Sequence, residues 1–90
     1  MNKNKLNIRM DLLRTAKTAF EINKPFDKNI SNVFINKALE EFENNLPKES
    51  ALKKELADFQ SQIDNMLNDP LKRIRWGEKI MTIASRLGCI

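Results

Sequence analysis

The first stretch of the chain, KLNIRMD, alternates between polar and apolar residues. Its apolar positions are Leu6, Ile8 and Met10, and its polar positions are Lys5, Asn7 and Arg9. A period of two residues is typical of a β-strand that buries one face and exposes the other. The pattern therefore predicts a strand over residues 4–10.

Apolar residues at helical spacing follow this stretch in two blocks, and polar residues mark their ends. The first predicted helix begins after Asp11, which stands at an N-cap position. It ends before Pro25, because the residue ahead of a proline disfavours the α conformation. The second helix runs to Asn44, with Asn29 as its predicted N-cap and Ser31 as the alternative. The sequence KPFDKN is the predicted turn between them.

Two more helices are predicted in the second half of the chain. The third spans residues 48–67, and its apolar positions, spaced alternately by four and three, are Leu52, Leu56, Phe59, Ile63 and Met66. This seam is expected to pack against another helix of the fold or of a partner subunit. Asp69 is the predicted N-cap of the fourth helix, with Pro70 at its first position. Trp76 in this helix is either a core residue or a base-stacking residue, and the pattern favours the core.

Charge is distributed unevenly along the 90 residues, whose net charge is +4. Residues 1–28 hold seven basic and three acidic side chains, residues 29–69 hold four and eight, and residues 70–90 hold five and one. A basic head and a basic tail favour a polyanionic partner such as nucleic acid. At 41% hydrophobic residues the chain can fold as one small domain, and so small a core makes oligomerisation a reasonable expectation.

Residue composition argues against catalysis and against bound cofactors. The chain has no histidine, which removes the commonest general base and metal ligand. Its single cysteine, Cys89, has no partner for a disulfide or a metal site. No apolar run reaches the length of a membrane span, and the polar, basic N-terminus carries no signal-peptide core. We therefore expect a cytoplasmic protein that is not an enzyme, holds no metal or cofactor and makes no membrane contact.

The order strand, helix, turn, helix over residues 3–45 resembles the ribbon-helix-helix family of DNA-binding proteins, to which the Arc and methionine repressors belong. The segments that carry the resemblance are KLNIRMD, LLRTAKTAF and NISNVFINKALEEF. The chain departs from the family at Asp11, where a proline is often found, and in the turn PFDKN, which lacks the usual glycine. The resemblance implies a mainly α fold: a dimer built from one N-terminal strand and two helices in a domain of residues 1–46. Residues 47–90 then form a two-helix extension.

In such a fold the strand pairs with the same strand of a second subunit, and the resulting ribbon enters the major groove of DNA. The resemblance then implies base contacts by Lys5, Asn7 and Arg9. The expected phosphate contacts, in the N-terminal arm and at the start of the second helix, are Lys3, Lys28, Asn29, Ile30 and Ser31. The expected dimer core consists of Leu6, Ile8, Met10, Phe34 and Ala38.

Three functions fit these expectations. The leading hypothesis is a homodimeric transcriptional repressor that binds double-stranded DNA sequence-specifically, with residues 47–90 extending the dimer or building a tetramer. The second is an antitoxin, or a plasmid relaxosome or partition protein, whose C-terminal helices bind a protein partner. The third is a helical oligomer with a purely structural role. The basic stretch LKRIRWGEK is a further candidate DNA contact, through Lys72, Arg73, Arg75 and Lys79.

Overall fold

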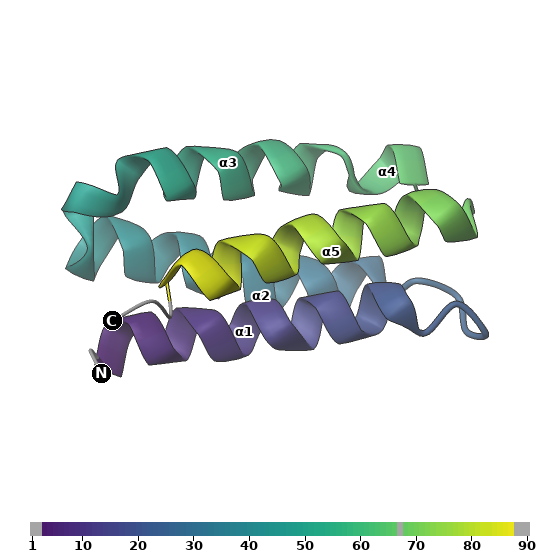
Figure 1. Cartoon of the computed structure of the whole chain (residues 1–90), viewed down its shortest axis with the longest axis horizontal. Helices are drawn as coiled ribbons and strands as arrows, with labels where there is room; N and C mark the ends of the chain where they lie inside the picture. Colours follow the sequence, from purple (N-terminus) through teal and green to yellow (C-terminus); the bar gives the residue numbers. More distant parts are fainter. Residues whose placement is uncertain (1–2, 67, 88–90) are drawn as a thin grey trace.

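The protein is helical throughout the part of the chain that the computed structural model describes, which is residues 3–66 and 68–87. Its elements are α1 (Lys3–Phe20), α2 (Lys28–Asn45), the 3₁₀ turn η1 (Pro47–Glu49), α3 (Ser50–Ser61), α4 (Ile63–Met66) and α5 (Pro70–Leu87). α3 and α4 follow one another along one line and together form the third rod of an antiparallel four-helix bundle (Figure 1). Cys89 lies outside the described residues.

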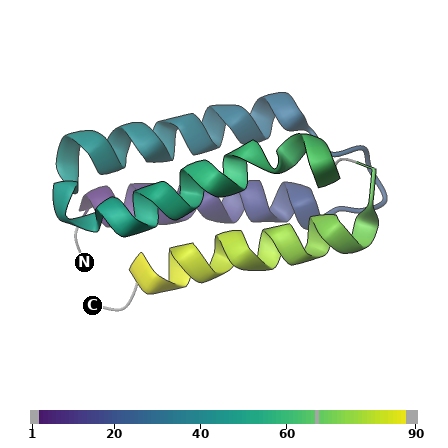
Figure 2. The same cartoon turned by 90° about the horizontal axis from the view of Figure 1, so that it is seen from above.

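The four rods pack in a ring, so that each one contacts two neighbours. α1 lies between α2 and α5, and α3 closes the ring between α2 and α5 (Figure 2). Consecutive rods run in opposite directions because the connections between them are short. A single core takes side chains from both halves of the chain, and its fully buried members include Ile8, Leu12, Ile35, Phe42, Leu56, Ile80 and Ile83.

The predicted strand over residues 4–10 is wrong, because these residues form the first turns of α1. Leu6 and Met10 lie on the outside of the helix, 40% and 43% exposed, while Ile8 is buried together with Leu12. The alternation therefore arises from two helical stripes on different sides of α1 and not from the two faces of a strand. Ile8 is the one β-branched residue in KLNIRMD, and the leucine, methionine, lysine and arginine around it favour helix. A helix also satisfies its backbone hydrogen bonds without a second chain.

The ribbon-helix-helix fold is wrong for the same reason. Such a fold needs an N-terminal β-strand, and residues 3–66 and 68–87 contain none. The residues expected to form a shared dimer core also lie on different sides of their helices. Ile8 and Ala38 are buried inside one bundle and Phe34 is partly exposed, whereas Leu6 and Met10 lie on the surface.

The N-cap of α2 is Asp27, and not the predicted Asn29 or Ser31. The Asp27 carboxylate accepts a 2.9 Å hydrogen bond from the backbone N–H of Ile30. The helix therefore starts at Lys28, two residues earlier than predicted, which places Asn29 inside the first turn. Ser31 is buried. Asp11, predicted to cap the first helix, lies in the middle of α1.

The start of α5 is as the sequence predicts. Pro70 is the first helical residue, and the Asp69 carboxylate accepts hydrogen bonds from the backbone N–H groups of Leu71 at 3.0 Å and Lys72 at 3.2 Å. A capping carboxylate also offsets the partial positive charge at a helix N-terminus. The direction in which α5 leaves the preceding turn is thus fixed by two adjacent residues.

The third rod is broken near Gln62, whereas the sequence predicts one continuous helix over residues 48–67. The backbone N–H of Gln62 bonds to the Phe59 carbonyl at 3.1 Å, three residues back rather than four, which tightens the turn. The predicted seam still packs inward, since Leu52, Leu56, Ile63 and Met66 are buried and Phe59 is partly buried. The break sets α4 against the first half of α5 (Figure 1).

Arg73 of α5 is buried, 4% exposed, where the sequence predicts a surface cation. Its guanidinium donates hydrogen bonds to the carbonyl oxygens of Lys24 (2.9 Å), Glu21 (3.0 Å) and Thr18 (3.1 Å), and it lies 5.6 Å from the centre of the Phe26 ring. The C-terminal end of a helix carries partial negative charge, so the end of α1 serves as the partner of this cation. Arg73 thereby ties the last helix to the end of the first.

Candidate functional site

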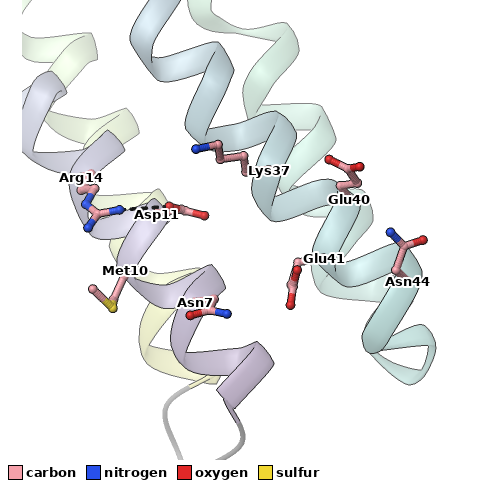
Figure 3. A pocket seen from close by; sticks show the side chains of 8 residues that line it. All are labelled: Asn7, Met10, Asp11, Arg14, Lys37, Glu40, Glu41 and Asn44. Atoms are coloured by element: carbon pink, nitrogen blue, oxygen red, sulfur yellow. Dashed lines mark hydrogen bonds and ion pairs between the residues drawn. The ribbon is translucent and has the colours of Figure 1, made fainter.

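A large hollow between α1 and α2 has mixed charge. Its volume is about 540 Å³, and Figure 3 shows side chains of both helices directed toward the gap between them. The lining residues are Asn7, Met10, Asp11, Arg14, Lys37, Glu40, Glu41 and Asn44. Three carboxylates and two cations meet here, and Asp11 pairs with Arg14 at 3.4 Å. Because these charges largely offset one another, this hollow has little electrostatic preference for an ionic ligand.

The Asp11 carboxyl in this hollow has a shifted pKa. Burial raises the pKa of the Asp11 carboxyl above its ordinary value, since its side chain is only 16% exposed and has lost much of its solvent. The cations Arg14 and Lys37 act in the opposite direction without cancelling this effect, and the charge of Glu41 adds to it. The ionised form of Asp11 is therefore held in the folded protein at a small cost.

A second hollow, between α4 and α5, contains charge of one sign. Its volume is about 340 Å³, and its lining residues are Gln62, Asn65, Met66, Lys72, Arg75, Trp76 and Lys79. The three basic residues are spaced by three and four along α5, so they share one side of the helix. Two side-chain amides come from the opposite wall, and none of the described residues that line the hollow is acidic. We refer to this hollow as the cationic pocket.

The basic residues of the cationic pocket stand apart from acidic side chains. Within residues 3–66 and 68–87, no ion pair includes Lys72, Arg75 or Lys79. Further along the same helix, Arg86 does pair with Glu55, at 2.7 Å. Lys79 lies 5.8 Å from the centre of the Phe59 ring. Three like charges without ion-pair partners repel one another, and a bound anion relieves that repulsion.

Trp76 forms part of the floor of the cationic pocket, and it is a core residue as the sequence favoured. Its indole is 3% exposed, and its Nε1–H donates a 2.8 Å hydrogen bond to the Phe59 carbonyl. The ring also meets Phe26 edge to face, with ring centres 5.7 Å apart. A ring held in this way gives the pocket a rigid base, and it is too deeply buried to stack on a nucleic-acid base.

The residues predicted to contact DNA bases do not share a surface. Lys5 lies 3.8 Å from Glu49 beside η1, Asn7 lines the hollow between α1 and α2, and Arg9 is partly buried. On a strand these three alternate residues would share one face. On a helix each step of two residues turns the side chain by about 200°, so Asn7 points away from Lys5 and Arg9, which lie four residues apart on one side of α1.

The predicted phosphate contacts at the start of α2 are similarly divided. Lys28 pairs with Asp64 across the bundle, at 2.5 Å. The Asp27 carboxylate already accepts a hydrogen bond from the backbone N–H of Ile30, where a phosphate was expected to bind. Ser31 is buried, and its hydroxyl oxygen has no hydrogen-bond partner. The exposed members of the set are Lys3, Lys28, Asn29 and Ile30.

Sequence reasoning identified the cations of the pocket but not its opposite wall. Gln62 and Asn65 carry no motif, and they reach the pocket because the third rod breaks beside the start of α5. Two polar residues next to the buried positions of the apolar seam were the available signal.

Comparison of the chain with models of protein families, with curated proteins and with solved structures yields no match. Among residues 3–66 and 68–87, no helix combines the length and apolar content that crossing a bilayer requires. The same residues contain no cluster of three or more histidine, cysteine, aspartate or glutamate side chains that could hold a metal ion. The geometry and charge of the surface are therefore the basis for assigning a function.

Proposed function

We propose that the protein binds the phosphate backbone of double-stranded DNA through the cationic pocket. The observation that supports this function is the row of Lys72, Arg75 and Lys79, three cations on one side of α5 without ion pairs among the described residues. The proposal keeps DNA as the partner that the charge pattern favours. It moves the contact from the N-terminus to the last helix.

The dimensions of this row suit a DNA strand. From Lys72 to Lys79 the helix rises by about 10 Å, at about 1.5 Å per residue. Successive phosphates of one strand advance by about 3.4 Å along the DNA axis, so the row can meet about three of them. The amides of Gln62 and Asn65 are further donors for phosphate oxygens. Contacts of this kind position a protein on DNA and carry no sequence information, so the proposed role is backbone binding and not base readout.

Salt dependence of binding tests the proposal directly. We expect the fluorescence anisotropy of a labelled duplex to report binding whose log affinity falls with log salt at a slope of about −3, because each phosphate contact contributes about −0.9. Each single substitution, Lys72→Gln, Arg75→Gln or Lys79→Gln, is expected to reduce the steepness by about one. The triple variant is expected to lose measurable binding.

The matched control is a second triple variant with the same net charge. Lys37→Gln, Lys48→Gln and Lys54→Gln remove three exposed lysines that form no ion pair in the described part of the chain and lie outside the pocket. This control is expected to keep most of the affinity and a slope near −3. Equal losses in the two triple variants would show that net charge alone drives binding. That result, or a wild-type protein that binds no duplex, would rule out the pocket as a DNA site.

A further inference from the structure

A stripe of apolar side chains runs along the outside of α1 and continues onto α5. It consists of Leu6, Met10 and Leu13, which are 40%, 43% and 40% exposed, and Met81, which is 40% exposed. We call these four residues the apolar stripe. The α1 members are spaced by four and three, the spacing by which one helix packs along another. α1 therefore carries two apolar seams, one in the core and one facing solvent.

The apolar stripe borders a hollow into which side chains of another molecule can fit. This hollow of about 300 Å³ lies between α1 and α5, and its lining residues are Leu13, Ala16, Lys17, Phe20, Glu21 and Met81. Gly77 of α5 leaves space for the Phe20 ring at this hollow, because a Cβ atom at position 77 would lie 2.8 Å from Cε1 of Phe20. The Phe20 ring can consequently lie against the backbone of α5. The surface is concave and apolar at this point, as grooves that bind amphipathic helices are.

The charges on α1 beside the apolar stripe are mostly positive, whereas α5 carries Glu78 three residues before Met81. Arg9 and Lys17 lie on α1 beside it and form no ion pair within the described residues. Glu21, at the rim of the hollow, is already paired with Lys24 at 3.4 Å. A second copy of the chain would bring the same cations into opposition, which disfavours self-association through this face. A partner with acidic side chains beside its apolar ones would be attracted.

The shape of this surface favours a helix over a lipid bilayer. The stripe side chains are more than half covered, and Leu13 and Met81 line the hollow, so the stripe presents little apolar area to a flat surface. Peripheral helices that enter a bilayer instead show a wide apolar face, often with aromatic residues. We propose that the apolar stripe and its hollow dock an amphipathic helix of a partner protein, one with apolar residues at alternating spacings of four and three flanked by aspartate or glutamate.

A designed peptide provides the test. The probe is an 18-residue helix, as long as α1, with leucine on one stripe and glutamate beside it. Two comparison peptides have the same leucines with lysine in place of glutamate, and the same composition with the stripe scrambled. We expect isothermal titration to show the probe binding at least about tenfold more tightly than either comparison peptide.

Variants locate the binding surface. Leu13→Ser with Met81→Ser is expected to weaken probe binding by about tenfold or more, because it removes the centre of the contact. Leu71→Ser is the matched control, since Leu71 is the most exposed leucine of α5, at 56%, and is not part of the stripe. It is expected to leave binding unchanged. Circular dichroism verifies that every variant remains folded.

Each alternative occupant predicts a different result, and each would overturn the proposal. A wild-type protein that is a dimer and becomes a monomer on Leu13→Ser would assign the face to a second copy. Binding to anionic vesicles that the same double variant abolishes, without preference for the probe over the scrambled peptide, would assign it to a membrane surface. The Gln triple variant of the cationic pocket is expected to bind the probe normally. Failure of DNA binding and failure of helix docking are thereby distinguishable.

Discussion

α1 and α5 lie side by side in the bundle and match in length and in charge, yet they present different surfaces. Each helix has 18 residues, of which five are basic and one is acidic. α5 buries one of its cations, Arg73, and aligns three in the cationic pocket. α1 spreads its cations around its circumference and exposes the apolar stripe instead. The spacing of the charged residues, and not their number, decides what each helix can bind.

The comparison depends first on α1 being a helix with separate inner and outer seams. Ile8→Ala is expected to lower the free energy of unfolding by about 3 kcal/mol, because Ile8 is fully buried in the core. Leu6→Ala is expected to change it by less than about 0.5 kcal/mol, since Leu6 lies on the outer seam. Urea denaturation measures both values. Similar large costs for the two variants would fit a strand with one buried face and would contradict the helix.

The comparison depends next on the two kinds of arginine in α5. Arg73→Met is expected to lower the free energy of unfolding by about 2–3 kcal/mol, because it removes three hydrogen bonds to backbone carbonyls in the last turn of α1 and the loop that follows. Arg75→Met, two residues away and exposed, is expected to cost less than about 0.5 kcal/mol. If both variants unfolded at the same urea concentration, Arg73 would not tie α5 to α1.

The smallest expected effect concerns Asp11, the single acid of α1. Its pKa is raised in the folded protein, so the folded state holds this proton more tightly than the unfolded chain does. The resulting stabilisation is present at acid pH and is lost as the pH rises through the folded-state pKa. The asparagine of Asp11→Asn does not titrate, so this variant does not lose the stabilisation as the pH rises. The free energy of unfolding of the variant minus that of wild type is therefore expected to increase from about pH 4 to pH 7, by less than about 1 kcal/mol. Urea midpoints of both proteins, measured across this pH range, test the direction of the change. A difference that falls as the pH rises would contradict the prediction.

Sequence reasoning succeeded where the signal was local. The apolar seam from Leu52 to Met66, the Asp69–Pro70 start of the last helix and the core position of Trp76 all depend on neighbouring residues, and all are confirmed. The strand was wrong because seven residues are too few to separate a period of two from two helical stripes. Leu12 and Leu13 extend those stripes, one inward and one outward, and identify the helix once they are included.

Of the cationic pocket, only the wall formed by α5 was predictable from the sequence. The row of Lys72, Arg75 and Lys79 is visible in the sequence, because their spacing follows directly from the helix. The burial of Arg73 is not, since its partners lie about fifty residues earlier in the chain. Which of four neighbouring cations turns inward is decided by tertiary packing between distant segments, and a local pattern carries no information about that.

The hydrogen bonds of Arg73 also have a consequence for the order in which the chain completes its fold. During synthesis α1 leaves the ribosome first, but the carbonyl groups of Thr18, Glu21 and Lys24 lack their guanidinium donor until Arg73 follows. The loop that joins α1 to α2 therefore reaches its final structure after the last helix has docked, however early its own residues are made. In an amide-exchange experiment on growing chains, protection in residues 21–27 would mark the moment at which the bundle closes.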